Sequence, residues 1–229
     1  MNKIDGSVPK HVGIVLDGNR RFAKKLMMEP WKGHELGAEK VEKLLSWSKE
    51  LGIKELTLYS FSMQNINRPK KEFDYLMNLF RKAFTKFKDD PRVKAEKIRV
   101  NIIGRLNLLP EDLQQLFKQI MDETKQNNNF VLNFAIAYGG REEIIDAVNK
   151  AIAKGEKVDE ESFKKYLYSS DEPDLIIRTG GEKRTSNFLP WQSTYSEWFF
   201  FDKTWPEFEK EDLVQVIDEF KERERRFGH

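Results

Sequence analysis

Short apolar runs alternate with longer amphipathic segments along the chain. Six runs of five to eight residues are apolar nearly throughout, which is typical of strands that are covered on both faces. They span 12–16, 55–61, 98–103, 130–137, 174–178 and 197–201. Between them apolar residues recur with a period near 3.6, which predicts helices, most clearly over 73–87, 113–121 and 213–220. Asp159 is expected to be the N-cap of a further helix.

This alternation predicts the fold class. Strands that alternate with helices, without a long linker or an internal repeat, favour a single α/β domain over residues 1–229. We expect a central, mainly parallel six-stranded sheet flanked by helices. In such sheets ligands bind beyond the carboxyl ends of the strands. Three polar segments directly follow predicted strands and are expected to meet at that edge: Asp17, 62–68 and 178–186.

The first of these segments suggests a cation and a phosphate. Residues 12–21 describe a buried strand that ends in the Asp17 carboxylate and passes into a helix with two arginines. The first turn of a helix presents unpaired N–H groups and a positive dipole end, which suit a phosphate. A lone aspartate would repel that phosphate unless a divalent cation lay between them, and Mg²⁺ commonly bridges one carboxylate and substrate phosphates. The segment therefore predicts a Mg²⁺-dependent enzyme acting on a phosphate or diphosphate ester.

The other two segments carry arginines, hydroxyls and amides. Arg178 and Arg184 flank a Gly-Gly pair after a buried strand. Guanidinium forks match phosphate oxygens and glycines let the backbone approach an anion, so we favour phosphate binding over a mobile surface loop. Ser62, Asn65 and Arg68 lie either in a polar turn that precedes a helix or in a loop that grips a second substrate.

Two further side chains and the aromatic content are ambiguous from spacing alone. Glu197 begins an apolar strand and is equally well a second Mg²⁺ ligand or the ion-pair partner of an arginine. His34 lies ahead of a helix, where a capping or packed histidine is commoner than a catalytic one, although phosphate contact is permitted. The 17 Phe and 5 Trp are core by default, yet some could line an apolar cleft beside the phosphate edge.

Composition narrows the function classes. Lys+Arg 40 and Asp+Glu 38 give a net charge of +2, so no broad electrostatic field favours nucleic acid or a membrane surface. The absence of cysteine excludes disulfides, thiolate metal sites and cysteine nucleophiles. Residues 1–7 lack the apolar core of a signal peptide, and no apolar stretch approaches the roughly 20 residues that span a bilayer. We expect a soluble, cytoplasmic protein, with transient membrane contact left open.

Taken together, several blocks resemble the cis-prenyltransferases, the undecaprenyl diphosphate synthase family, over nearly the full chain. The blocks follow the order and spacing of the family at 11–21, 33–34, 56–62, 65–69, 138–141, 177–182, 184–192, 195–197 and 223–228. The resemblance implies a homodimer whose α/β subunits elongate an allylic prenyl diphosphate with isopentenyl diphosphate. It also implies Mg²⁺ as the cofactor and Z double bonds in the product.

The resemblance further implies roles for individual residues. Asp17 would hold Mg²⁺ and help the allylic diphosphate to leave, and Glu197 of the same or the partner subunit would complete the metal site. The allylic substrate would contact Gly18, Asn19, Arg20, Arg21, Phe22 and His34. Isopentenyl diphosphate would contact Arg178, Arg184, Thr185 and Ser186. The condensing groups would be positioned by Ser62, Asn65 and Arg68, with Asn65 taking part in proton removal.

The chain also departs from the family pattern. Gln64 replaces a usual Glu, Ile66 replaces a usual aromatic residue, and Pro30 lies near a usual diphosphate-binding Arg. Phe130 is bulky where a Leu is common, at a position that resembles the floor of the product tunnel. We therefore expect a short-to-medium product, and an atypical primer or a non-head-to-tail condensation stays open.

Three rival functions fit less well. A non-catalytic partner subunit of a heteromeric prenyltransferase would lose the Asp-Gly-Asn block, which is intact at 17–19. A phosphatase with a nucleophilic aspartate would usually show Asp-x-Asp, whereas this block has one carboxylate. RNA binding has only local arginines in its favour, because the overall charge is nearly balanced.

Overall fold

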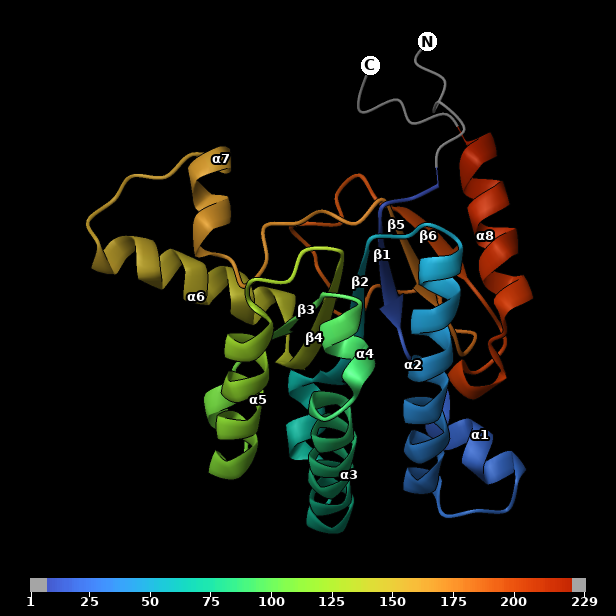
Figure 1. The fold of residues 1–229 in the computed structure, drawn as a ribbon. Helices are drawn as coiled ribbons and strands as arrows, with labels where there is room; N and C mark the ends of the chain where they lie inside the picture. Colours follow the sequence, from blue (N-terminus) through green and yellow to red (C-terminus); the bar gives the residue numbers. More distant parts are fainter. Residues whose placement is uncertain (1–7, 224–229) are drawn as a thin grey trace.

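The computed structural model describes residues 8–223 and confirms the α/β class (Figure 1). Its six strands form one sheet in the order β3-β4-β2-β1-β5-β6, and every pairing in it is parallel. The strands are β1 (His11–Val15), β2 (Glu55–Ser62), β3 (Ile98–Ile103), β4 (Phe130–Tyr138), β5 (Leu175–Arg178) and β6 (Glu197–Phe200). Each predicted strand agrees within one residue at either end. The sheet is thus wholly rather than mainly parallel.

Helices separate the strands as the apolar periodicity predicted. They are α1 (Asn19–Lys25), α2 (Gly33–Glu50), α3 (Lys70–Lys88), α4 (Pro91–Ala95), α5 (Glu111–Thr124), α6 (Gly140–Ala153), α7 (Glu160–Phe163) and α8 (Lys210–Glu222). Short 3₁₀ turns η1 (Pro30–Lys32), η2 (Met63–Asn67), η3 (Leu106–Leu108), η4 (Lys164–Tyr166) and η5 (Trp205–Glu207) join them. Asp159 caps α7 as predicted, because its carboxylate accepts a hydrogen bond of 2.8 Å from the Ser162 N–H.

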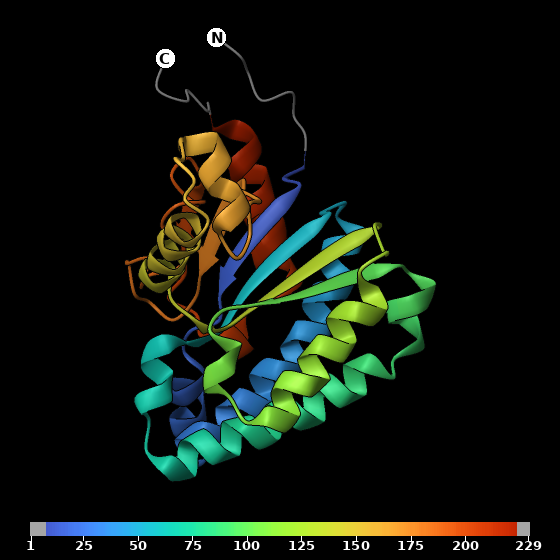
Figure 2. The ribbon, with the colours of Figure 1, turned by 90° about the vertical axis from the view of Figure 1, so that its left-hand side faces the viewer.

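The two faces of the sheet are covered differently. Figure 2 shows α2, α3 and α5 against one face, and α6 with α7 on the other side. The main core lies under the first group, where Phe84 of α3 packs edge-on against Phe117 and Phe134 with ring centroids 4.8 and 4.9 Å apart. On the other face Tyr59 stacks on Phe188 at 4.8 Å within a second cluster. Phe84 is therefore part of the core, and the partly buried Phe73, Phe80 and Phe87 of the same stripe pack against it.

The strand order brings the three polar segments together. β1 lies between β2 and β5 and is hydrogen-bonded to both. Because all three strands run in the same direction, Asp17, Ser62 and Arg178 all lie at the carboxyl-end edge of the sheet. The predicted meeting of the segments at that edge is confirmed.

No helix within residues 8–223 is long and apolar enough to cross a membrane. The expectations of a cytoplasmic location, of transient membrane contact and of one domain over 1–229 stay predictions. The segment 1–7 and most of the 223–228 block lie outside the described residues.

Candidate active site

A cavity of about 520 Å³ lies at the carboxyl-end edge of β1, β2 and β5. Its walls unite ten of the residues predicted from the sequence, namely Asp17, Gly18, Asn19, Arg20, His34, Ser62, Asn65, Arg68, Arg178 and Ser186. They come from segments that are far apart along the chain. We call this space the polar cavity.

The turn from β1 into α1 depends on a glycine. Gly18 has φ of 101°, and a Cβ atom there would lie 2.7 Å from the Cβ of Thr204. Both the left-handed backbone and the close approach therefore exclude a larger residue. The Gly18 N–H donates to Asp17 Oδ1 at 2.6 Å, and Asn19 Nδ2 donates to the Leu16 carbonyl at 3.0 Å. This turn fixes the carboxylate beside the start of the helix.

Two arginines hold the Asp17 carboxylate. Arg178 Nη2 donates to Asp17 Oδ2 at 3.0 Å, and Arg21 Nη2 donates to Asp17 Oδ1 at 3.2 Å. Arg178 is buried, and its Nη1 also donates to Ser186 Oγ at 2.6 Å and to the Arg184 carbonyl. Its Nε has no hydrogen-bond partner among the described residues. An anion that entered this cavity would meet guanidinium groups that are already oriented.

Arg21 reaches the site through a second glycine. Its Nη1 donates to the Gly180 carbonyl, and a Cβ atom on Gly180 would lie 2.7 Å from Arg21 Nη2. The φ of Gly180 is 91°, which a residue with a side chain rarely adopts. The Gly-Gly pair was predicted to let an anion approach the backbone. In this structure the Arg21 side chain lies against Gly180. Arg21 contacts Asp17 although it is not among the residues that line the polar cavity.

A buried carboxylate organises the opposite wall. Glu72 of α3 accepts a hydrogen bond from Arg68 Nη1 at 2.8 Å and lies 3.6 Å from Arg20 Nε. Arg68 Nη1 also lies 3.3 Å from His34 Nε2. Because arginine can only donate, His34 Nε2 is the acceptor in this pair. Burial, followed by the charges of Arg68 and Arg20, lowers the pKa of His34 to about 3. His34 is therefore a neutral side chain at physiological pH.

The 62–68 segment is both a polar turn and a wall of the site. In η2, Asn65 Oδ1 accepts a hydrogen bond of 3.0 Å from the Ser62 N–H, within a reciprocal capping box. This contact leaves the amide NH₂ group of Asn65 to meet a ligand. The two interpretations that the sequence left open are compatible.

Besides Arg21, four predicted residues are not among those that line the polar cavity: Phe22, Arg184, Thr185 and Glu197. The Arg184 side chain is exposed and pairs with Glu182 at 2.6 Å, and Thr185 is also exposed. In this conformation only the backbone carbonyl of Arg184 contacts the site, through Arg178.

Glu197 lies at the opposite edge of the sheet. It begins β6 and is level with Leu175 and Val12 in the strand register, five positions before Asp17. At a rise of about 3.3 Å per residue this separates the two carboxylates by roughly 16 Å along the strands. Glu197 Oε2 instead pairs with Arg223 Nη1 at 2.6 Å. A metal site completed by Glu197 of the same subunit is therefore wrong, and completion by the partner's copy stays a prediction.

Sequence reasoning missed two residues that shape the site. Glu72 belongs to a charged segment, Lys-Lys-Glu, that reads as an exposed helix start, and only the tertiary structure buries it. The Tyr59 hydroxyl donates to the Tyr138 carbonyl at 3.2 Å and to the Ser186 carbonyl at 3.3 Å. Burial raises the pKa of Tyr59. Tyr59 thus holds the backbone of Ser186, which carries the hydroxyl that Arg178 contacts.

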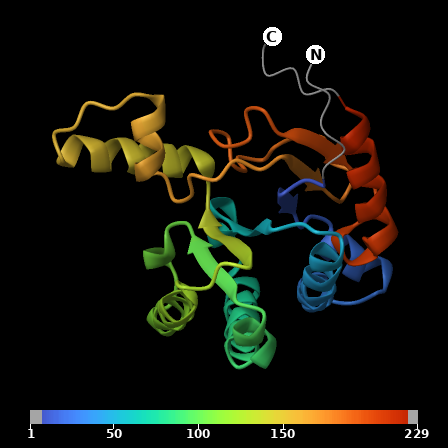
Figure 3. The same cartoon turned by 45° about the horizontal axis from the view of Figure 1, so that its top comes forward.

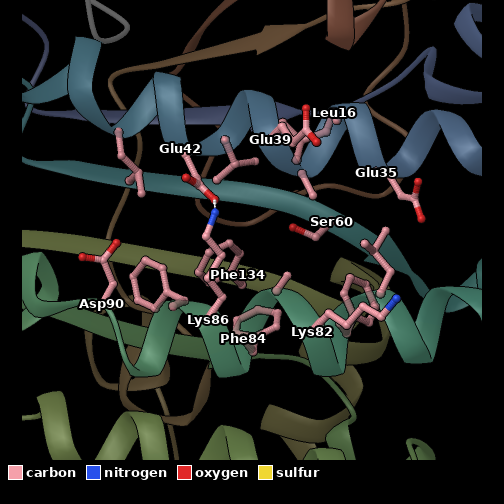
Figure 4. A pocket seen from close by; sticks show the side chains of 18 of the residues that line it. Leu16, Glu35, Glu39, Glu42, Ser60, Lys82, Phe84, Lys86, Asp90 and Phe134 are labelled. Atoms are coloured by element: carbon pink, nitrogen blue, oxygen red, sulfur yellow. Dashed lines mark hydrogen bonds and ion pairs between the residues drawn. The ribbon is translucent and has the colours of Figure 1, made fainter.

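A second cavity, of about 540 Å³, adjoins the first. The two cavities share the lining residues Leu16, Asn19, His34 and Ser60. Figure 4 shows Phe84 and Phe134 inside it, with α2 and α3 on its two sides. Further apolar walls come from Val41, Leu45, Leu76, Leu79, Phe80, Ala83, Phe87, Val93 and Ile98. We call this the apolar cavity, and it confirms the predicted cleft beside the phosphate edge.

The position predicted as the tunnel floor lies behind this wall. Phe130 is buried but is not among the residues that line the apolar cavity. Its register partner on β3, Ile98, is one of them. Phe134, which belongs to the same strand as Phe130, does line the cavity, and the role of Phe130 as tunnel floor stays a prediction.

The donor set fits a cation that binds together with its substrate. Within residues 8–223 no group of three or more metal-ligating side chains is arranged to hold a metal. Asp17 is the single carboxylate among the described residues that line the polar cavity, and its side chain is 33% exposed. Mg²⁺ is commonly bound by one or two carboxylates together with substrate phosphates. The residues present fit that arrangement rather than a preformed protein cage.

The chain is similar to several known proteins. Residues 15–228 match the family model described as "Putative undecaprenyl diphosphate synthase". A tritrans,polycis-undecaprenyl-diphosphate synthase (geranylgeranyl-diphosphate specific) of Methanopyrus kandleri is 49% identical over 98% of this chain and 86% of its own length. An isoprenyl transferase of Thermotoga maritima is 46% identical, over 96% and 97%. The crystal structure of lavandulyl diphosphate synthase from Lavandula x intermedia, in complex with dimethylallyl diphosphate, gives a TM-score of 0.88 at 33% identity, over 97% and 99%.

Proposed function

We propose a specific condensation for this chain, which belongs to the undecaprenyl diphosphate synthase family of prenyltransferases. An allylic prenyl diphosphate loses its pyrophosphate as the C–O bond breaks, and its allylic carbon bonds to isopentenyl diphosphate. A proton then leaves the new chain, and a Z double bond forms. The observation that carries this proposal is the junction of the polar cavity with the apolar cavity through four shared residues.

The geometry supports a division of the two substrates. The allylic diphosphate is assigned to the start of α1, beside Asp17 and Arg21, with its hydrocarbon in the apolar cavity. Isopentenyl diphosphate is assigned to Arg178 and Ser186, whose side chains already contact each other. Guanidinium groups aimed at the departing pyrophosphate stabilise its charge in the transition state. Asn65 is a neutral amide and a weak base, so we expect pyrophosphate or water to accept the proton finally.

Asp17 would hold Mg²⁺ together with oxygens of the allylic diphosphate. When bound, Mg²⁺ neutralises charge on the leaving group. Arg21 and Arg178 now share the carboxylate, and an incoming diphosphate competes for both guanidinium groups. Binding of the substrate therefore releases Asp17 oxygens. Removal of Mg²⁺ by EDTA should abolish turnover, and added Mg²⁺ should restore it.

Geranylgeranyl diphosphate is the primer that we propose, because the Methanopyrus kandleri relative is named as specific for it. The test is incubation with labelled isopentenyl diphosphate, Mg²⁺ and dimethylallyl, farnesyl or geranylgeranyl diphosphate, followed by sizing of the products. We expect the highest incorporation with the geranylgeranyl primer and products shorter than undecaprenyl. Incorporation with none of the primers would refute the reaction, and predominant chains of undecaprenyl length or longer would refute the product length.

A non-head-to-tail condensation is the second candidate. The solved lavandulyl diphosphate synthase to which the chain is similar holds dimethylallyl diphosphate. Gln64, which lines the polar cavity, and Ile66 replace usual family residues in the same loop. Incubation with dimethylallyl diphosphate as the sole prenyl substrate separates the two reactions. A prenyl product under that condition supports the second candidate, and its absence supports elongation by isopentenyl diphosphate.

We further propose a homodimer. Ile145, Val148 and Ile152 are exposed and are spaced to lie on one face of α6. Figure 3 shows α6 extending away from the sheet, and the exposure of the three side chains shows that none of the described residues covers this apolar face. A second copy that covers it would remove the face from water. The second copy could also bring its Glu197 toward the Asp17 of the first copy, which the Glu197 of the first copy does not reach.

Subunit mixing tests this arrangement. Asp17→Asn and Glu197→Gln chains are each expected to be nearly inactive alone. In a mixed dimer that shares sites between subunits, one site keeps both carboxylates, so activity returns to about half of the wild-type value per mixed dimer. If the Glu197 of each subunit serves its own Asp17, mixing restores nothing. A monomer in sedimentation experiments at assay concentration would refute the dimer itself.

A further inference from the structure

The start of α6 is capped by a residue that is distant in the sequence. Gly139 occupies the N-cap position and has no side chain that could accept from the first N–H groups of the helix. Asn187 supplies two acceptors instead. Its carbonyl accepts from the Gly140 N–H at 2.9 Å, and its Oδ1 accepts from the Arg141 N–H at 2.8 Å. The segment that contains Asn187 is therefore fixed to α6.

Glu142, the third residue of α6, completes this arrangement. Its Oε2 accepts from Asn187 Nδ2 at 2.9 Å, so the oxygen and the nitrogen of the Asn187 amide both have partners in the helix. A Cβ atom on Gly140 would overlap Pro190, so only a glycine there lets the two segments lie this close. We call the three hydrogen bonds of Asn187 with the first turn of α6 the Asn187 clamp.

The clamp acts on an unfavourable backbone conformation. Ser186 and Asn187 have φ of 49° and 65°, in the left-handed region that residues with a side chain rarely adopt. Such a conformation persists only where the surrounding contacts determine it. The Tyr59 hydroxyl donates to the Ser186 carbonyl at 3.3 Å, and the clamp holds the next residue. The backbone of Ser186 is thus held by two separate sets of contacts.

The backbone that is held in this way orients a residue of the polar cavity. Ser186 Oγ accepts from Arg178 Nη1 at 2.6 Å, and the same Nη1 donates to the Arg184 carbonyl. Residues 184–186 therefore determine where one arm of the Arg178 fork lies. Asn187 itself lines the cavity, but its side-chain amide is engaged with α6. Loss of the clamp would free the hydroxyl and the carbonyl that orient the fork.

We propose that Asn187 is a positioning residue for the diphosphate assigned to Arg178 and Ser186. The clamp fixes the left-handed backbone, so that the Ser186 hydroxyl and the Arg178 fork meet the anion in one geometry. This inference rests on the proposed assignment of isopentenyl diphosphate to these two residues. It gives Asn187 and Glu142 a role in substrate affinity that neither exerts by direct contact with the substrate.

An exchange of the donor and the acceptor tests the clamp. Asn187→Asp keeps the acceptor for the Arg141 N–H but sets two carboxylates against each other, so KM for isopentenyl diphosphate should rise about 20-fold. In Asn187→Asp/Glu142→Gln the Gln amide donates to the Asp carboxylate and the net charge is that of the wild type. KM should then return to within about threefold of the wild-type value. The control is Asn149→Asp, which adds the same charge at an exposed position of α6 and should leave KM unchanged.

Asn187→Gly is the second variant, because glycine keeps the left-handed backbone and removes the side-chain contacts. KM for isopentenyl diphosphate should rise about tenfold, and KM for the allylic primer should stay unchanged. Thermal denaturation checks that each variant folds. A lower melting temperature with an unchanged KM would show a merely structural role and would overturn the proposal. A double variant that remained as weak as Asn187→Asp would also overturn it, since Asn187 would then contact the substrate itself.

A binding measurement separates this inference from the proposed reaction. Isopentenyl diphosphate is titrated calorimetrically, with Mg²⁺ and without a primer, against the wild type, Asn187→Asp and Asn187→Asp/Glu142→Gln. The dissociation constant should rise in the single variant and return in the double variant, as KM does. That pattern in a protein that transfers no prenyl group would refute the reaction and keep the role of Asn187. Prenyl transfer with equal affinity in all three proteins would keep the reaction and overturn the role of Asn187.

Discussion

Both edges of the sheet carry polar side chains, but they use them differently. At the carboxyl-end edge, Asp17 and Arg178 line a cavity. At the amino-end edge, His11 Nε2 contacts Thr57 Oγ1 at 2.8 Å, and Asn133 Nδ2 donates to Glu55 Oε1 at 2.6 Å. These latter side chains are satisfied mainly by one another. Polar residues in buried strands therefore mark a binding site only where a cavity leaves their hydrogen-bonding capacity to a ligand.

Charge separates the edges as well. Three arginines line the polar cavity, against a single carboxylate among the described residues. At the amino-end edge, burial lowers the pKa of His11 to about 4 and raises the pKa of Glu55 to about 7. Burial there suppresses charge, whereas the cavity concentrates positive charge. The first edge suits anions, and the second suits a stable sheet.

Replacing the carboxylate should have the largest effect. Asp17→Asn should lower the rate of prenyl transfer by on the order of 10²–10³-fold, because it removes the proposed cation ligand and keeps the side-chain shape. Incorporation of labelled isopentenyl diphosphate measures this rate. The matched control at the other edge is Glu55→Gln, which should keep wild-type turnover. Similar losses in both variants would contradict the comparison of the edges.

Replacing the buried arginine should have the next largest effect. Arg178→Lys loses the fork that contacts Asp17 and Ser186 together, so KM for isopentenyl diphosphate should rise about 10–100-fold. Arg99→Lys, an exposed position at the amino end of β3, is the control and should leave KM unchanged. Steady-state kinetics at saturating primer give both values. An unchanged KM in Arg178→Lys would remove that residue from the binding site.

A substitution at the amino-end edge should change the pH dependence of the free energy of unfolding rather than the activity. The pKa of Glu55 lies above its usual value of 4.5, so the folded protein binds that proton more tightly than the unfolded chain. The corresponding stabilisation is complete below pH 4.5 and is lost as the pH rises through about 7. Between these limits the free energy of unfolding of the wild type should fall by about 3 kcal/mol relative to Glu55→Gln. Urea unfolding at both pH values measures this, and parallel pH dependence in the two proteins would refute it.

The smallest change is expected in product length. Phe134 lines the apolar cavity, whereas Phe130 lies behind its wall. Phe134→Leu should lengthen the main product by about one isoprene unit, because its smaller side chain enlarges the cavity. Phe130→Leu, the paired control, should shift product length less. Chromatographic sizing compares them, and a larger shift in Phe130→Leu would restore Phe130 as the tunnel floor.

Local signals made most of the fold predictable. Apolar runs bounded by polar residues located all six strands within one residue, because burial on both faces of a parallel sheet demands continuous apolar sequence. The strand order was not predictable in the same way, because it depends on packing between distant segments. The role of Glu197 was left open for a related reason, since it depends on the parallel pairing of β5 and β6, which puts the first residue of β6 at the amino-end edge.

The site was predictable wherever chemistry follows a strand end directly, as at Asp17 and Arg178. The site was not predictable where a supporting side chain comes from an element that is distant in the sequence. Glu72 approaches Arg68 and Arg20 from α3, and Tyr59 supports Ser186 from the opposite face of the sheet. Their sequence neighbourhoods match ordinary helix and strand positions. Such supporting residues become visible only after the helices are placed.

The central place of β1 has a consequence for the newly made protein. Asp17 and Arg21 are synthesised early, but the second guanidinium group that holds the Asp17 carboxylate, that of Arg178, arrives with β5, more than two thirds of the way along the chain. A nascent or truncated polypeptide that lacks β5 has no assembled pocket and cannot capture isoprenoid precursors. Prenyl transfer therefore requires the chain to be complete through β5. The time at which activity first appears during translation would show when the last strands join the sheet.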